Sequence, residues 1–110
     1  MDSQTLSQEI TLLHADICSA LAEPRRILIL YALSDRPFTV NDLSAEIGIS
    51  QPATSRHLKI LRERGLVHAV RQGVNVEYSL IDPRLIEALD TLRTVLKASI
   101  AHRASLILAE

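Results

Sequence analysis

Apolar residues recur every three or four positions at both ends of the chain, which is the spacing of one face of a helix. They are Leu6, Ile10, Leu13, Ile17 and Leu21 near the N-terminus, and Leu85, Leu89, Leu92, Leu96 and Ile100 near the C-terminus. The pattern predicts amphipathic helices over residues 1–21 and 83–109. Asp82 is expected to cap the second of these, with Pro83 in the first helical position.

Between Pro24 and Leu33 the apolar residues are dense rather than confined to one stripe. They are Ile27, Leu28, Ile29, Leu30 and Leu33. A helix that is apolar on most sides is usually buried. We therefore expect a helix from Pro24 to about Leu33 to form the centre of the core.

Residues 39–64 carry the start and stop signals of two short helices. Thr39 is expected to cap the first, with Phe38 packing on Leu43 as a hydrophobic staple. Gly48 suits the left-handed position that ends a helix. Two short helices joined by a tight turn form a helix-turn-helix, whose second helix can enter the major groove of DNA.

The second helix of this pair is expected from Gln51 to Arg64, with Ser50 as its cap and Pro52 in its first turn. Leu58 and Leu61 fall on one stripe, and Gly65 ends the helix. The residues expected to face outward are Gln51, Thr54, Ser55, Arg56, Lys59 and Arg62. An ordinary solvated charged helix is the alternative interpretation, and the capped pair makes it the weaker one.

Alternating β-prone residues on both sides of Gln72-Gly73 predict a hairpin over residues 66–80. Its expected inward residues are Val67, Ala69, Val76, Tyr78 and Leu80. A hairpin that directly follows a recognition helix is a wing, and Arg71 near its tip can reach the minor groove or a phosphate. If the hairpin only packs against the core, Arg71 is a solvated charge.

The length of 110 residues predicts a single domain over residues 1–110. With 47% hydrophobic and 23% charged residues, the composition is that of a globular protein. The chain has no apolar run long enough to span a bilayer and no signal-peptide pattern at its start. Its single cysteine, Cys18, excludes an internal disulfide framework. We therefore expect a cytoplasmic protein with no membrane partner.

The net charge of −1 hides a strong asymmetry. The segment from Ser50 to Gln72 contains five basic residues and one acidic residue, Glu63, so its formal charge is +4. The rest of the chain then has a formal charge of −5. The basic residues are Arg56, Lys59, Arg62, Arg64 and Arg71. A basic face on an acidic body suits approach to DNA phosphates from one side.

The two terminal helices predict a second copy of the chain as a partner. A three-helix core needs only one face of each, and an exposed apolar stripe is costly. We expect a twofold homodimer built on the helices over residues 1–21 and 83–109. Its two recognition helices would meet successive major grooves, about 34 Å apart, on an inverted-repeat operator.

Residues 21–80 closely resemble the ArsR/SmtB family of winged helix-turn-helix repressors. The matching segments are LAEPRRILIL, DLSAEIGISQPATSRHLKILRERGLV and RQGVNVEYSL, and the run SQPATSRHLKIL is close to a family signature. The resemblance implies a mainly α fold with a β-hairpin wing, in which four helices precede the hairpin and a fifth follows it. It also implies a dimeric repressor that releases its double-stranded DNA operator when a small inducer binds.

By position in the family, Gln51, Ser55, Arg56 and His57 would contact DNA. Gln51 can pair with adenine and Arg56 with guanine, whereas Ser55 suits a base edge or a phosphate. The imidazole of His57 and the remaining cations suit phosphates. The full expected set is Ser50, Gln51, Thr54, Ser55, Arg56, His57, Lys59, Arg62 and Arg71.

The chain departs from the family's metal sensors. Their cysteine-pair site at the start of the third helix corresponds to Thr39–Leu43, which has no thiol. Their site on the last helix keeps Asp82 but has Arg84, Val95 and Ala98 at its other positions. Soft metals need thiolates and zinc takes four ligands, so the sequence predicts no metal and no cofactor. Asp82 is then a helix cap.

One non-standard metal site remains as an alternative. His14 and Cys18 are four residues apart on one helix, and His102 could approach across the dimer. The simpler interpretation is a small buried cysteine and two ordinary polar positions. Redox sensing by Cys18 would need an intersubunit pair, because the chain has no second cysteine.

Two other functions compete with the inducible repressor. The first is a DNA-binding regulator with no small-molecule site, and the second is a winged-helix module that binds protein instead of DNA. An enzyme is not expected, because the sequence has no nucleophile–base pair, no glycine-rich phosphate loop and no His/Cys cluster.

Overall fold

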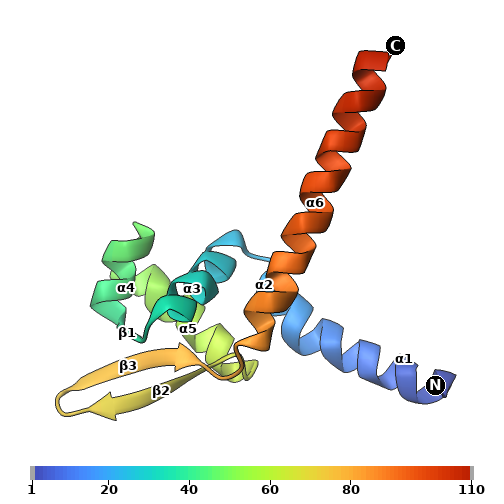
Figure 1. The fold of residues 1–110 in the computed structure, drawn as a ribbon. Helices are drawn as coiled ribbons and strands as arrows, with labels where there is room; N and C mark the ends of the chain where they lie inside the picture. Colours follow the sequence, from blue (N-terminus) through green and yellow to red (C-terminus); the bar gives the residue numbers. More distant parts are fainter. Residues whose placement is uncertain (1, 110) are drawn as a thin grey trace.

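The computed structural model describes residues 2–109 (Figure 1). The helical segments are α1 (Ser3–Leu12), η1 (Leu13–Cys18), α2 (Ser19–Leu21), α3 (Pro24–Asp35), α4 (Val40–Ile47), α5 (Gln51–Glu63) and α6 (Arg84–Ala109). The strands are β1 (Phe38–Thr39), β2 (Val67–Gln72) and β3 (Asn75–Leu80). The expected mainly helical fold with a hairpin before the last helix is confirmed. Met1 and Glu110, the ends of the predicted domain, lie outside the described residues.

The core forms where α3, α4 and α5 meet. Ile29, Leu30 and Leu33 of α3 are buried in it, which confirms α3 as the central helix. Leu28 is 52% exposed, so its predicted burial is wrong. The reason is geometric: successive helix positions are turned by about 100°, and Leu28 points away from the side that α4 and α5 cover.

The predicted N-terminal helix is one continuous helical path with a π-helical stretch, η1, in its middle. The N–H of Ser19 donates to the carbonyl oxygen of His14, five residues earlier, which widens the turn. Leu13, Ile17 and Leu21 are separated by two successive steps of four, and a wider turn keeps them on one side. Ile17 and Leu21 pack on the core, whereas α1 has no buried residue.

The strands form one antiparallel sheet in the order β1-β3-β2. The turn of the hairpin is Gly73–Val74, flanked by the Gln72–Asn75 pair, and not Gln72-Gly73 as predicted. Gly73 has a φ of +63°, and a glycine in the first central position is typical of a tight hairpin turn. The predicted inward residues of the hairpin are all buried or half-buried.

Strand β1 was not predicted, because two residues are too short to show an alternating pattern. Phe38 pairs with Tyr78 and Thr39 pairs with Glu77. Since Thr39 is also the cap of α4, this pairing joins the wing directly to the start of the helix-turn-helix.

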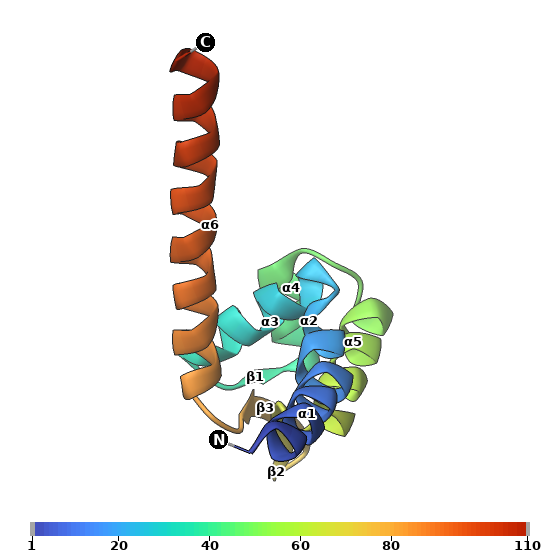
Figure 2. The same ribbon diagram turned by 90° about the vertical axis from the view of Figure 1, so that its right-hand side faces the viewer.

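Helix α6 leaves the body of the protein and extends away from it (Figures 1 and 2). Leu89 is its one buried residue within the described chain, Leu85 and Ile86 are half-buried, and every residue from Asp90 to Leu108 is exposed. The principal extents of 60 × 41 × 21 Å reflect this projection. Among the described residues, no helix combines the length and apolar character needed to cross a lipid bilayer.

Candidate DNA-binding surface

Two side chains start the helices of the helix-turn-helix as the sequence predicts. The hydroxyl oxygen of Thr39 accepts a hydrogen bond from the Asp42 N–H at 3.2 Å. The hydroxyl oxygen of Ser50 accepts one from the Ala53 N–H, also at 3.2 Å. Each bond satisfies an N–H that the first turn of a helix leaves free, so both caps are confirmed.

The turn between α4 and α5 is closed at Gly48. This glycine has a φ of +80°, and its N–H donates to the carbonyl oxygen of Ser44 at 2.9 Å. The hydroxyl of Ser44 donates in turn to the carbonyl oxygen of Ile49 at 2.6 Å. Ser44 therefore holds both sides of the turn, a role that sequence reasoning missed because it depends on the folded position of Ile49.

The buried side of α5 consists of Thr54, Leu58 and Leu61. The prediction that Thr54 faces outward is wrong, since its exposed fraction is 0%. Its hydroxyl donates to the carbonyl oxygen of Ser50 at 2.9 Å, so the polar group is satisfied inside the protein. The sequence does indicate this burial, because Thr54 lies four positions before Leu58 and continues the apolar stripe.

The exposed side of α5 carries the other outward residues that the sequence predicts. Positions 51, 55, 59 and 62 follow steps of four and three, so Gln51, Ser55, Lys59 and Arg62 share one side, with Arg56 beside them. All five are exposed. Within residues 2–109, none of the three cations forms an ion pair with a carboxylate. Their charge is therefore available to a ligand.

His57 is half-buried between this exposed side and the core. Its Nδ1 atom is buried without a hydrogen-bond partner among the described residues. Burial lowers the pKa of His57 below its usual value of 6.5, and the nearby charges of Arg26, Arg25 and Arg56 lower it further against the opposing effect of Glu23. The folded structure therefore favours the neutral form of the His57 imidazole.

The start of α3 adds a cation that the sequence analysis did not assign to the site. Arg25 is exposed, and it is close enough to His57 for its charge to act on the pKa of that imidazole. Its neighbour Arg26 is instead engaged internally, where Nε donates to the Ala20 carbonyl oxygen at 2.6 Å. A basic pair at the start of a helix was the available signal, but only the fold brings Arg25 beside α5.

Arg64 differs from the other cations of the basic stretch. Its Nη1 lies 3.7 Å from Oδ1 of Asp16 in η1. Arg64 therefore points toward the N-terminal helical path, and four of the five cations of the +4 stretch remain without an ion pair in the described chain.

Arg71 of the wing lies two positions before the turn residue Gly73. Arg71 pairs with Val76 across the hairpin and is exposed. Like the cations of α5, it has no ion pair within the described chain. The hairpin extends from the side of the body where α5 and α4 lie, on the side away from α6 (Figure 1).

Asp82 is held by Arg84 in a bidentate ion pair. The guanidinium nitrogens lie 2.7–3.1 Å from both carboxylate oxygens, and Oδ1 also accepts the Arg84 N–H. These hydrogen bonds lower the pKa of Asp82 to about 2. Both oxygens already have partners, so Asp82 acts as a helix cap that its own neighbour neutralises.

The other proposed ligands come from two segments of the chain, η1 and α6. His14 and Cys18 are exposed on η1, so the expectation of a buried cysteine is wrong for the single chain. His102 is exposed on the distal half of α6, which points away from the N-terminal helices (Figure 2). Within residues 2–109, no group of three His, Cys, Asp or Glu side chains gathers at metal-binding distance.

Comparison with known proteins gives the same fold and family. The model of bacterial regulatory proteins of the arsR family matches residues 23–69. The HTH-type transcriptional regulator NmtR of Mycobacterium tuberculosis (strain ATCC 25618 / H37Rv) is 40% identical over 90 residues, which cover 82% of this chain and 71% of NmtR.

Solved structures agree with this assignment. The crystal structure of M. tuberculosis Rv0081 matches with a TM-score of 0.77 at 33% identity, over 86% of this chain and 96% of that one. The homodimeric winged helix-turn-helix DNA-binding domain (fragment 1–100) of Mb0332 from Mycobacterium bovis, solved by NMR, has a TM-score of 0.76 at 22% identity over 93% of each chain, which shows a shared fold. On its sequence, its fold and its capped helix-turn-helix, this chain belongs to the arsR family of bacterial regulatory proteins.

Proposed function

We propose that this regulator is a transcriptional repressor that binds an inverted-repeat operator as a homodimer and leaves it when a small inducer binds. The observation that carries the proposal is the two-sided character of α5. Thr54, Leu58 and Leu61 fix one side of the helix in the core, and the opposite side presents polar and cationic groups that no described protein group neutralises.

The exposed groups divide into base readers and phosphate contacts. The side-chain amide of Gln51 pairs a donor with an acceptor, which matches adenine, and the guanidinium of Arg56 offers two donors, which match guanine in the major groove. Lys59 and Arg62 lie further along α5, where point charges suit phosphates. Ser50 caps the helix and can still donate its hydroxyl proton to a phosphate.

Three residues extend the phosphate contacts beyond this side of α5. The Nε2–H of His57 can donate one hydrogen bond to a phosphate. Arg71 contributes from the wing, and Arg25 contributes from the start of α3. Thr54 is not part of the proposed contact set, since its hydroxyl is satisfied by the carbonyl oxygen of Ser50.

Exposed apolar stripes support the homodimer. Leu6 and Ile10 of α1 are 39% and 52% exposed, and Leu96 and Ile100 of α6 are 53% and 52% exposed. An apolar groove of about 700 Å³ lies between η1 and the first half of α6. Contiguous apolar surface of this kind marks an interaction site, and Mb0332, which shares the fold, is a homodimer.

The support for release by an inducer is the membership of this chain in the arsR family. In one protomer Asp82 is held by Arg84, and no group of three His, Cys, Asp or Glu side chains gathers at metal-binding distance among the described residues. The alternative is a repressor controlled by its abundance or by a partner protein.

The testing experiment is selection of bound duplexes from a random library, followed by gel shifts on the recovered sequence. We expect an inverted repeat, bound by two protomers, with affinity that falls steeply as salt rises. Metal salts, arsenite, peroxide, polysulfide and a chelator are then added one at a time. An affinity that none of them changes supports the regulator without a small-molecule site. If no duplex is enriched and binding is independent of salt, the DNA-binding proposal is overturned in favour of a protein-interaction module.

A further inference from the structure

The orientation of α6 relative to the DNA-binding body depends on a short contact. Leu85, Ile86 and Leu89 are its buried or half-buried residues, and the rod beyond them is exposed. From Asp90 to Ala109 the helix extends about 30 Å at 1.5 Å per residue. A small rotation at the base therefore becomes a displacement of several ångströms at the distal end.

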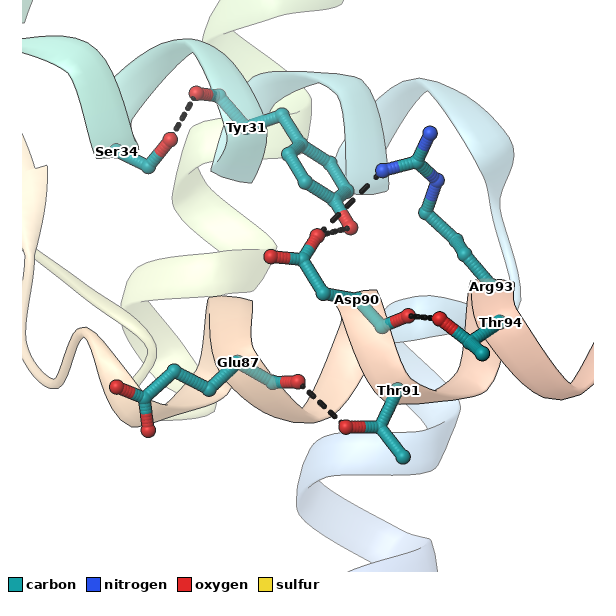
Figure 3. Close-up of polar contacts among 7 residues, drawn as sticks. All are labelled: Tyr31, Ser34, Glu87, Asp90, Thr91, Arg93 and Thr94. Carbon is teal, nitrogen blue, oxygen red and sulfur yellow. Dashed lines mark hydrogen bonds and ion pairs between the residues drawn. The ribbon is translucent and has the colours of Figure 1, made fainter.

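A polar cluster lies at the point where α6 leaves the body (Figure 3). The Tyr31 hydroxyl of α3 donates to Oδ1 of Asp90 in α6 at 2.7 Å, between residues 59 apart in the sequence. Arg93 Nη1 lies 3.5 Å from the same oxygen, and the Arg93 guanidinium lies 5.4 Å from the centroid of the Tyr31 ring. Each of the three side chains thus contacts the other two.

This cluster differs in kind from the apolar contact beside it. Apolar packing has little directional preference, so leucine and isoleucine alone allow one helix to rotate on another. A hydrogen bond weakens steeply when its angle departs from linear. The bond from Tyr31 to Asp90 is therefore suited to select one angle between α3 and α6.

The angle between α3 and α6 at this cluster also affects the position of the recognition helix, α5. Ile29, Leu30 and Leu33 of α3 share one core with Leu58 and Leu61 of α5. A close-packed core moves as a unit, so α5 follows α3. In a dimer joined through α6, the angle between α3 and α6 then determines how far apart the two α5 helices lie.

We propose that Tyr31, with Asp90 and Arg93, is a positioning residue that sets the half-site spacing this regulator accepts. This inference rests on the proposed function, because spacing has meaning only for a dimer on a two-part operator. Tyr31 acts through α6 and touches no DNA.

The test compares Tyr31→Phe with Tyr78→Phe, which removes the same hydroxyl from the other tyrosine of the chain. Fluorescent duplexes carry one half-site, the selected operator, or operators with one base pair added or removed at the centre. For Tyr31→Phe we expect unchanged half-site affinity, an operator affinity lowered roughly tenfold, and weaker discrimination between spacings. Tyr78→Phe is expected to keep the wild-type preference. Unchanged discrimination in Tyr31→Phe, or an equal loss on half-site and operator, overturns the inference.

Asp90→Asn provides a second comparison. The amide oxygen still accepts from Tyr31, while the charge facing Arg93 is lost, so we expect partial retention of the spacing preference. Asp90→Ala removes both contacts and should match Tyr31→Phe. If Asp90→Asn and Asp90→Ala behave identically, the hydrogen bond from Tyr31 is not the element that sets the spacing.

A readout without DNA separates this inference from the proposed function. Spin labels on Glu63→Cys, in a Cys18→Ser background, report the distance between the two α5 helices of a dimer. We expect a narrow distance distribution in that background and a broader or shifted one when Tyr31→Phe is added. The same distribution in both proteins overturns the inference, while the absence of any intersubunit distance overturns the proposed dimer itself.

Discussion

Arg64 at the end of α5 lies 3.7 Å from Asp16 of η1, whereas Arg62, two residues earlier, has no such partner in the described chain. The two arginines are equivalent in a count of charges, but they point to different sides of the protein. The cation of Arg62 is available to a ligand, whereas the cation of Arg64 is engaged with the N-terminal helical path.

This pair predicts different responses to truncation. Arg62→Ala should weaken binding to all duplexes and reduce the slope of log affinity against log salt by about two contacts, one from each protomer of the dimer, or roughly 1.8. Arg64→Ala should leave the slope unchanged. Its ion pair is exposed on both sides, at 42% and 53%, so its loss should cost under about 1 kcal/mol of stability. Anisotropy titrations across a salt series measure the slopes, and equal slopes for the two variants would contradict the assignment.

Base reading and phosphate binding on α5 can be separated in the same way. Arg56→Ala should cost about 1–3 kcal/mol on the operator and much less on random DNA, which relaxes specificity. Lys59→Ala should weaken operator and random DNA about equally. Competition titrations on both duplexes provide the measurement. An equal loss on both duplexes for Arg56→Ala would refute its role as a base reader.

The buried hydroxyl of Thr54 predicts a stability effect. Thr54→Val keeps the shape of the side chain but removes the 2.9 Å bond to the Ser50 carbonyl oxygen. We expect about 1 kcal/mol less stability in urea unfolding, because the carbonyl loses its side-chain donor and a hydroxyl-to-methyl exchange is not neutral in a packed site. Affinity for DNA per folded molecule should stay near wild type. A specific loss of operator binding by fully folded Thr54→Val would restore Thr54 to the contact set.

The lowered pKa of His57 predicts a pH dependence of stability. At pH values well above 6.5 both the folded and the unfolded chain hold a neutral imidazole, so the lowered pKa of His57 does not change the stability. Below 6.5 the unfolded chain takes up a proton first, and the folded state loses relative stability until its own lower pKa is passed. The charges near the imidazole are Arg25, Arg26, Arg56 and Glu23.

The matching experiment compares wild type with His57→Gln, which does not titrate. Thermal unfolding is followed between pH 7.5 and pH 5.5. The melting temperature of wild type should fall more steeply over this range than that of His57→Gln. Parallel curves would show that His57 keeps an ordinary pKa in the folded protein.

The exposed stripe of α6 predicts a separation of folding from assembly. Leu96→Glu should give a folded monomer, since Leu96 is 53% exposed in one protomer and makes no core contact. Burial of a leucine in the dimer is worth about 1.5–3 kcal/mol per side chain. Ala98→Glu is the control, because position 98 lies about 200° around the helix from position 96. Sedimentation and circular dichroism report mass and folding, and a Leu96→Glu variant that stays dimeric would exclude this stripe from the interface.

The local sequence determined the elements and most of the candidate site. The caps at Thr39 and Ser50 and the glycine at position 48 are signals within a few residues, and each appears in the structure as expected. The exposed positions of Gln51, Ser55, Arg56, Lys59 and Arg62 follow from the same local periodicity.

Only the tertiary structure decided which residues of distant segments contact one another. Arg64 turned toward Asp16 of η1. Phe38 and Thr39 formed a strand by pairing with β3. Tyr31 donated a hydrogen bond to Asp90, which lies 59 residues further along the chain. Contacts of this kind depend on how the whole core packs, because the side chain that accepts a hydrogen bond or a charge comes from another segment. Helix periodicity and capping act over three or four residues, so they reveal which face a residue occupies but not which partner meets it there.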